Sequence, residues 1–162
     1  MNFKSLLNEE NPKLELSIKH IGTVKIQLFP KVAPKTVENF LKLIDKHYFD
    51  GLIFHRVIEN FMIQGGWGEP VDSITGEFMQ NGFDNLLLHT RGVLSMARTS
   101  DPNSASSQFF IMHKDAPHLD GAYAAFGAVY EGIEIIDLVA KQPTGFQDKP
   151  IDDIIIESFK RI

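Results

Sequence analysis

Apolar and polar residues alternate along two neighbouring stretches near the start of the chain, and this alternation constrains the fold more than any other feature. Every second residue is apolar across Leu14–Ile18 and again across Val24–Leu28. Successive side chains of an extended strand point to opposite faces, so a period of two predicts strands with one buried face. Gly22 lies near the turn between the two stretches. The sequence therefore predicts a β-hairpin.

Several further stretches have the character of strands, whereas only two have that of helices. Apolar residues recur at i, i+3, i+4 and i+7 from Val37 to Ile44. Pro34 suits a first turn, so this spacing predicts a helix that ends before Tyr48. A second, short helix is predicted over Ile133–Ala140. Many strands and two distant helices favour an antiparallel barrel or sandwich capped by helices. The other predicted strands are Leu52–Ile58, Val93–Arg98, Gln108–Met112, Ala124–Tyr130 and Ile154–Phe159.

The composition excludes several classes of protein. The 162 residues suit one domain, 1–162, of which we expect residues 1–12 to form an exposed extension. The formal charge of −5 argues against nucleic-acid binding, and no apolar run is long enough to span a membrane. The absence of cysteine removes disulfides and thiolate chemistry. Asn8–Asn11 is polar where a signal peptide would be apolar, so we predict a cytoplasmic protein.

Two weaker signals have ordinary explanations. None of the six histidines forms an i, i+4 pair around a glutamate, so no metal site is predicted. Gly65 and Gly66 are followed by no Lys-Ser or Lys-Thr pair, which argues against a phosphate loop. We interpret Trp67 as a cover for the adjacent loop rather than a substrate contact.

The stretch Phe54–Gly66 carries the most chemistry. On a regular strand, His55 and Arg56 point to opposite faces, so they are not expected to contact the same substrate. A lone arginine on a strand is ordinarily a solvated residue. Gln64, however, can brace a guanidinium through its amide, and Phe61-Met62 can supply apolar surface beside it.

A second polar residue, Gln108, begins an otherwise apolar strand. Alternation places Gln108, Phe110 and Met112 on one face and Phe109 and Ile111 on the other. A buried glutamine satisfied by backbone groups is as reasonable an interpretation as a functional one.

These motifs together resemble the cyclophilin family of peptidyl-prolyl cis-trans isomerases, and most closely its bacterial cytosolic branch. The resemblance runs from about Leu14 to Phe159. It implies a closed eight-stranded antiparallel β-barrel capped by two α-helices. The motifs are Phe54-His55-Arg56, Phe61 to Gly66, Leu94-Ser95-Met96-Ala97, Ser107 to Ile111, His118-Leu119-Asp120-Gly121 and Phe126-Gly127.

The resemblance also implies roles for individual residues. Arg56 matches the family's catalytic arginine. Gln64 and Gln108 match the residues that support this arginine and form the polar floor of the proline pocket. His118 lies where many members have tryptophan, and Tyr123 where many have histidine. The walls of the proline pocket correspond to Phe61, Met62, Phe110 and Leu119, and the strand edge that pairs with substrate backbone corresponds to Ala97 and Arg98.

The implied reaction is rotation about X-Pro peptide bonds, which breaks no covalent bond and needs no cofactor. The implied partners are proline-containing peptides and unfolded or nascent polypeptides, bound by a monomer. Cyclosporin binding should be weakened by His118, which buries less apolar area than tryptophan. The loop Trp67–Thr75 is shorter than the family's glycine-rich loop, which puts its accessory pocket in doubt. The alternative function is a non-catalytic proline-binding or chaperone module that uses the same pocket.

Overall fold

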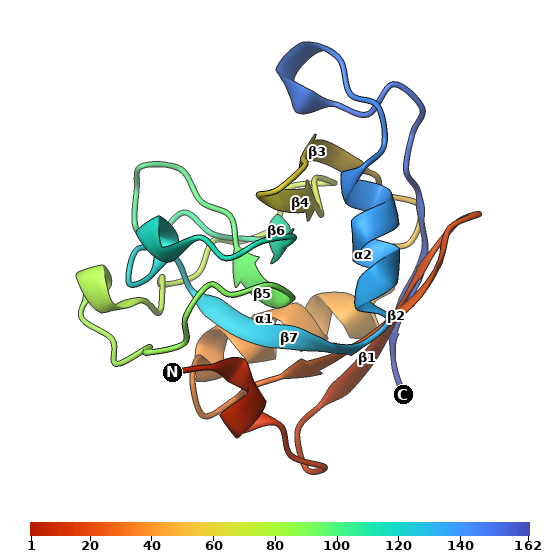
Figure 1. Ribbon diagram of the computed structural model, residues 1–162. Helices are drawn as coiled ribbons and strands as arrows, with labels where there is room; N and C mark the ends of the chain where they lie inside the picture. Colours follow the sequence, from red (N-terminus) through yellow and green to blue (C-terminus); the bar gives the residue numbers. More distant parts are fainter.

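The computed structural model describes all 162 residues, and its main feature is one antiparallel sheet of eight strands (Figure 1). The strand order is β3-β4-β6-β5-β7-β2-β1-β8. Helix α1 (Pro34–Asp45) packs against β8, and α2 (Ile133–Ala140) packs against β2, β3 and β4. The strands are β1 (Lys13–Ile18), β2 (Gly22–Leu28), β3 (Phe54–Ile58), β4 (Met62–Gly65), β5 (Val93–Met96), β6 (Phe109–Met112), β7 (Ala125–Glu131) and β8 (Ile156–Arg161). Neither helix is long and apolar enough to cross a membrane.

The prediction of a closed barrel is wrong, because the sheet curls into an open half-barrel. Its edge strands β3 and β8 form no ladder with each other and meet only beside the isolated bridge between Ile53 and Ile155. Beside this bridge, the Phe54 amide at the start of β3 donates to the Ile154 carbonyl at 3.0 Å. The segment before β8, residues 141–153, adds no strand to this edge and loops out beyond the end of α2 (Figure 1).

Both helices and most strands lie where the periodicity predicts them. α1 begins at Pro34, and α2 has the predicted bounds. The exception is β4, which has no counterpart among the predicted strands. Its four residues include Met62 and Ile63, both buried on opposite faces, so the segment shows no alternation between apolar and polar residues.

The main core fills the concave interior of the sheet and is centred on Phe40 of α1. The Phe40 side chain is fully buried. Its ring centroid lies 4.9 to 5.6 Å from those of four other phenylalanines. Such tilted and edge-to-face contacts add stabilisation to the burial of apolar area. The four partners are Phe49, Phe109, Phe126 and Phe159.

A second, smaller apolar cluster contains side chains from the other face of the strands. Phe110 and Met112 belong to it, whereas their neighbours Phe109 and Ile111 belong to the main core, as the alternation predicts. The N-terminal segment also packs here. Most residues of 1–12 are exposed, but Phe3 is buried in this cluster, and the terminal amine donates to the Leu86 carbonyl at 2.7 Å. The segment is therefore docked on the sheet.

Candidate active site

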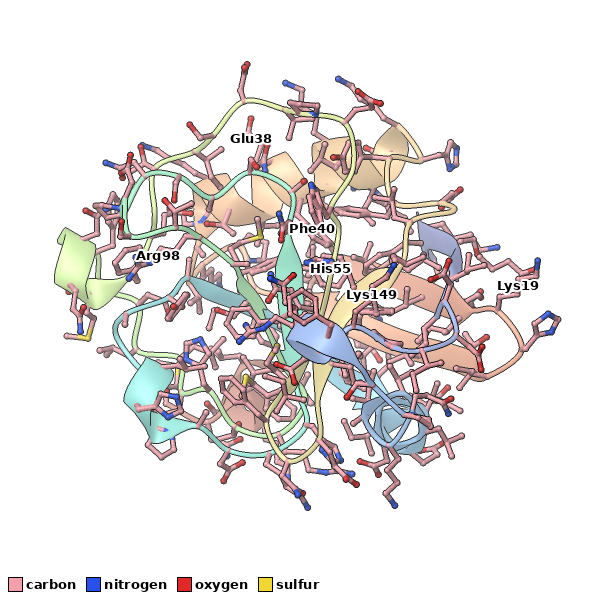
Figure 2. All side chains as sticks on the ribbon, turned by 90° about the horizontal axis from the view of Figure 1, so that it is seen from above. Lys19, Glu38, Phe40, His55, Arg98 and Lys149 are labelled. Carbon is pink, nitrogen blue, oxygen red and sulfur yellow. The ribbon has the colours of Figure 1, made fainter.

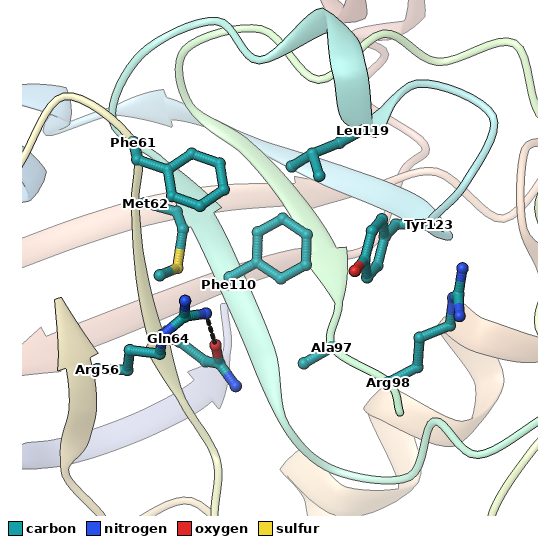
Figure 3. A pocket seen from close by; sticks show the side chains of 9 residues that line it. All are labelled: Arg56, Phe61, Met62, Gln64, Ala97, Arg98, Phe110, Leu119 and Tyr123. Carbon is teal, nitrogen blue, oxygen red and sulfur yellow. Dashed lines mark hydrogen bonds between the residues drawn. The ribbon is translucent and has the colours of Figure 1, made fainter. Parts of the chain in front are cut away.

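A small pocket opens beside the second cluster and brings nine of the eleven predicted site residues together (Figure 3). Its volume is about 140 Å³. Gln108 and His118 do not line it, but each contacts a residue that does. The lining residues are Arg56, Phe61, Met62, Gln64, Ala97, Arg98, Phe110, Leu119 and Tyr123.

Strand pairing explains how residues distant in sequence meet here. Arg56 of β3 is paired with Gln64 of β4, and Gln64 is paired in turn with Phe110 of β6. Directly paired residues project to the same face of a sheet. One row across three strands therefore places a guanidinium, an amide and an aromatic ring on the same face.

A chain of polar side chains orients the arginine. The Gln64 Nε2 donates to the Gln108 Oε1 at 3.0 Å, which leaves the Gln64 Oε1 free to face Arg56. The Arg56 Nη1 donates to that oxygen at 3.4 Å, a long hydrogen bond. Gln108 thus acts on the arginine through Gln64. Arg56 is exposed and forms no ion pair, so no carboxylate neutralises its charge.

Apolar side chains form the floor and walls beside Arg56. Met62, Phe110 and Leu119 are buried, and Phe61 is half-buried. The Tyr123 ring meets Phe110 edge-on, with centroids 5.7 Å apart. These groups leave the pocket with few polar partners other than the guanidinium and the amide of Gln64.

His118 lies outside the pocket but supports its wall. It is exposed, and its ring stacks on Phe61 with the centroids 5.7 Å apart. A ligand that extends past Phe61 would therefore meet an imidazole.

Arg98 has a side-chain role that the sequence did not indicate. Its Nε and Nη2 both donate to the Ala122 carbonyl, at 3.0 and 2.7 Å. The guanidinium carbon lies 4.7 Å from the ring centroids of both Tyr123 and Phe78, within cation–π range. Arg98 therefore fixes Tyr123 as a wall of the pocket, in addition to any role of its backbone.

His55 departs from the predicted orientation. A bulge interrupts the pairing between Phe54 and Arg56, so that two residues of β3 face one position of β4. The expectation that His55 and Arg56 serve opposite faces rests on a regular strand and is wrong here, because both line a second cavity next to the pocket. Burial lowers the pKa of His55, and the nearby Arg56 charge acts in the same direction.

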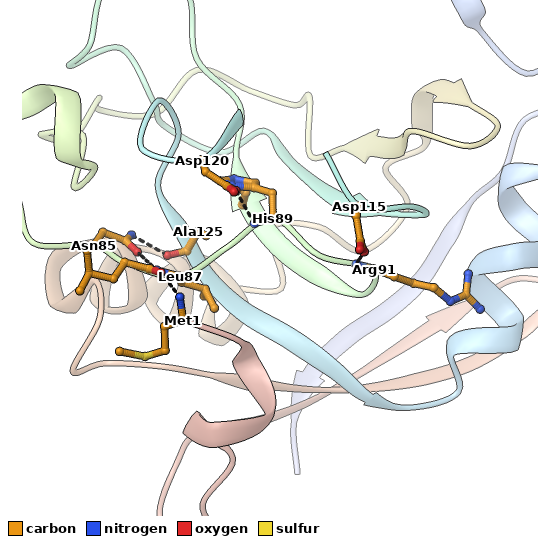
Figure 4. Close-up of polar contacts among 10 residues, drawn as sticks. Met1, Asn85, Leu87, His89, Arg91, Asp115, Asp120 and Ala125 are labelled. Carbon is orange, nitrogen blue, oxygen red and sulfur yellow. Dashed lines mark hydrogen bonds and ion pairs between the residues drawn. The ribbon is translucent and has the colours of Figure 1, made fainter. Parts of the chain in front are cut away.

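A buried histidine lies behind Phe110 and was also not singled out from the sequence. The His89 ring stacks on Phe110 at 6.0 Å, and its Nε2 and the Ser95 Oγ are 2.8 Å apart. The Asp120 carboxylate accepts from the His89 backbone N–H at 2.6 Å and lies 3.1 Å from Nδ1 (Figure 4). Burial lowers the pKa of His89, although Asp120 opposes this effect.

We expect the free energy of unfolding to decrease as the pH falls below about 6.5, because the unfolded chain then binds a proton that buried His89 resists. Each such histidine adds a slope of at most about 1.4 kcal/mol per pH unit, and His55 contributes in the same direction. Urea unfolding between about pH 7.5 and about pH 5.5 measures this slope. The variant His89→Gln should reduce it, whereas His20→Asn, at an exposed site, should not. An unchanged slope in His89→Gln would contradict the assignment.

Comparisons with known proteins give one consistent result. The family model described as "Cyclophilin type peptidyl-prolyl cis-trans isomerase/CLD" matches residues 13–161. The peptidyl-prolyl cis-trans isomerase CYP18-1 of Arabidopsis thaliana is 44% identical over 140 residues, which cover 83% of this chain and 87% of that protein. The isomerase cyp18 of Streptomyces antibioticus is 42% identical, with 86% and 92% covered.

Longer relatives and solved structures agree with this result. A Streptococcus pyogenes relative, whose name joins a phosphatase to the isomerase, is 38% identical, and the chain spans 40% of its length. The crystal structure of a Cryptosporidium parvum cyclophilin-type isomerase superposes with a TM-score of 0.84 at 32% identity, covering 94% of this chain and 98% of that one. The same protein in the presence of the dipeptide Ala-Pro gives a TM-score of 0.80.

Proposed function

The chain belongs to the cyclophilin-type family of peptidyl-prolyl cis-trans isomerases, and we propose that it isomerises X-Pro bonds in the pocket beside Arg56. The observation that carries this assignment is an arginine without an acidic partner, held by Gln64 over an apolar pocket. The Cryptosporidium parvum relative solved in the presence of Ala-Pro supports the binding of proline peptides.

The chemistry requires only that the site fit a twisted amide better than a planar one. Rotation about a prolyl bond has a barrier of about 20 kcal/mol, because the nitrogen lone pair is delocalised into the carbonyl. As the bond twists, the lone pair localises on nitrogen and becomes a hydrogen-bond acceptor. A donor aimed at this nitrogen stabilises the transition state and not the ground states.

Arg56 is placed to be that donor. Its Nη1 is occupied by Gln64, and the rest of the guanidinium fork faces the pocket (Figure 3). A charge-assisted hydrogen bond formed only in the transition state contributes about 1.5 to 3 kcal/mol.

The apolar walls supply a second contribution. Phe61, Met62, Phe110 and Leu119 surround a proline ring and exclude water, which favours the more polar planar amide. We assign the backbone of Ala97 and Arg98 to pairing with the substrate chain, since both lie at the pocket rim just after β5 ends. Holding the chain on both sides of the bond favours the twisted conformers.

NMR exchange spectroscopy on an Ala-Pro peptide tests the proposal. Catalysis predicts exchange between the cis and trans signals at substoichiometric protein. Chemical-shift changes without faster exchange would instead indicate the alternative, a proline-binding or chaperone module without turnover.

Gln108→Leu tests the polar chain that orients Arg56. Loss of the Gln108 acceptor frees the Gln64 amide to rotate, and we expect kcat/KM to fall about 3- to 10-fold, the worth of a neutral hydrogen bond acting indirectly. Because Arg56 remains, the loss of kcat/KM should be smaller than the loss caused by Arg56→Ala. An unchanged kcat/KM would argue against a positioning role.

Cyclosporin inhibition tests the place of His118. We expect His118→Trp to bind this drug more tightly than the wild type, because indole buries more apolar area beside Phe61 than imidazole does. Inhibition titrations of both proteins measure the difference. Nanomolar inhibition of the wild type would contradict the proposed weakening.

We further propose the biological setting that the sequence suggests. The 162 residues act as one isomerase domain and as a monomer, in the cytoplasm, on unfolded or nascent chains. We also propose that the protein belongs to the bacterial cytosolic branch of the family, and the bacterial relatives include the Streptomyces antibioticus isomerase.

A further inference from the structure

A second cavity adjoins the pocket across the Arg56 side chain. Its volume is about 830 Å³, several times that of the pocket, and within the range of sites that hold ligands. Arg56 lines both, so a molecule bound in the pocket can continue into the cavity without leaving the surface. We call this cavity the flanking groove; its other lining residues are Ile53, His55, Trp67 and Gly145–Ile151.

Two irregularities of the sheet create the flanking groove. The bulge in β3 lets His55 lie beside Arg56 instead of on the opposite face. No ladder joins β3 to β8, so the edge of β3 has no partner strand. The 3₁₀ turn Phe146–Asp148, in the segment before β8, packs against β3 instead of pairing with it. Figure 2 shows His55 and Lys149, from these two segments, lying close together.

The groove presents large apolar side chains to solvent. Trp67 is 67% exposed, Phe146 87% and Ile151 68%. The Trp67 ring contacts His55 edge-on, with centroids 5.3 Å apart. Exposed apolar groups gathered at one cavity are typical of binding sites.

The turn that carries Phe146 is held in an unfavourable backbone conformation. The next two residues, Gln147 and Asp148, have φ values of 57° and 60°. The left-handed region is uncommon for residues other than glycine, and such strain is concentrated at functional sites and ligand clamps. The Phe146 side chain beside this turn lies outside the core and lines the groove.

We propose that the flanking groove holds an aromatic side chain of the same polypeptide whose prolyl bond lies in the pocket. The inference rests on the proposed function and extends it to substrate selection. Arg56 joins the two cavities, which gives the occupant a continuous path. Trp67 and Phe146 offer ring faces and edges to an aromatic group, and Lys149 offers a cation.

The spacing of the aromatic residue follows from chain geometry. An extended chain advances about 3.3 Å per residue, so about two to four residues cross the width of one arginine side chain. The aromatic residue should therefore lie about three residues from the proline. Two peptides, one with phenylalanine before the proline and one with phenylalanine after it, show on which side of the proline the groove binds.

Fluorescence gives a direct readout, because Trp67 is the only tryptophan of the chain. We expect an Ala-Pro peptide with phenylalanine three residues away to change the Trp67 emission on binding, whereas Ala-Pro alone should not. A change of equal size with both ligands would overturn the inference, since the signal would then report the pocket.

Kinetics tests the consequence for catalysis. In the wild type, kcat/KM for the phenylalanine peptide should exceed that of its alanine counterpart about 2- to 10-fold, the effect of a typical aromatic contact. The double variant Trp67→Ala, Phe146→Ala should lose this preference and keep its activity on the alanine peptide. Leu86→Ala, which removes an exposed apolar side chain outside both cavities, should keep the preference.

The outcomes separate the two proposals. If neither peptide is isomerised, the proposed function fails. If the phenylalanine and alanine peptides have equal kcat/KM values, whether the phenylalanine lies before or after the proline, the proposed function stands and the groove proposal is overturned. A preference that survives in the double variant would also overturn it.

Discussion

Arg56→Ala is expected to reduce kcat/KM for prolyl isomerisation about 10- to 150-fold while the protein stays folded. The loss corresponds to about 1.5 to 3 kcal/mol, the worth of one charge-assisted hydrogen bond to the twisted amide nitrogen. Arg56 is exposed and its one side-chain hydrogen bond is the 3.4 Å bond to Gln64, so its removal should cost little stability. A protease-free NMR assay of exchange, with urea unfolding alongside, measures both quantities.

Arg56→Lys is the matched control for this experiment. Lysine keeps the positive charge but lacks the planar fork that serves Gln64 and the substrate nitrogen together. We therefore expect most of the loss to remain in this variant. If lysine restored full activity, charge alone would account for the effect, and near-normal exchange in Arg56→Ala would refute the mechanism.

The opposite pattern is expected of Phe40→Ala, which should cost stability and spare the chemistry. Phe40 is fully buried among four other phenylalanines, so truncation leaves a cavity that the curled sheet cannot fill. The expected loss is about 3 to 5 kcal/mol in the free energy of unfolding, or about 6 to 20 °C in Tm. Calorimetry or urea unfolding provides the measurement.

Activity per folded molecule completes that test. Phe40 contacts Phe109, whose side chain faces the main core, whereas Phe110 faces the pocket. Assayed well below its Tm, Phe40→Ala should retain a kcat/KM close to that of the wild type. Phe40→Leu, which fills most of the cavity, should recover much of the stability. A Tm within about 2 °C of the wild type for Phe40→Ala would contradict the central role of this ring.

Periodicity predicted the elements that bury one face, and it failed where both faces are buried or the pairing is irregular. The hairpin β1–β2 and helix α1 each have one apolar side, so the spacing of their apolar residues predicts them from the sequence. β4 is short and buried on both sides, so nothing distinguishes it from a loop. The open edge between β3 and β8 depends on where the segment before β8 turns, which no local pattern encodes.

The site likewise combines residues that the sequence identifies with roles that only the folded structure reveals. Arg56, Gln64 and Phe110 could be identified from motifs, because their residue types and order are distinctive. The role of the Arg98 side chain depends on long-range contacts with Phe78 and Tyr123, and the orientation of His55 depends on a bulge. Both arise from tertiary packing, which spacing along the chain does not reveal.

The pairing of Phe110 with Gln64 also has a consequence for how this protein can change. Phe109 and Phe110 face opposite sides of β6, so sliding this strand by one position would exchange the ring in the core with the ring in the pocket. The exposed loop before it, residues 99–104, makes no strand pairs and can take up insertions or deletions. Length variation in that loop is therefore tolerable only where the register is preserved, and a displacement of one residue would abolish the activity in a protein that still contains every residue of its site.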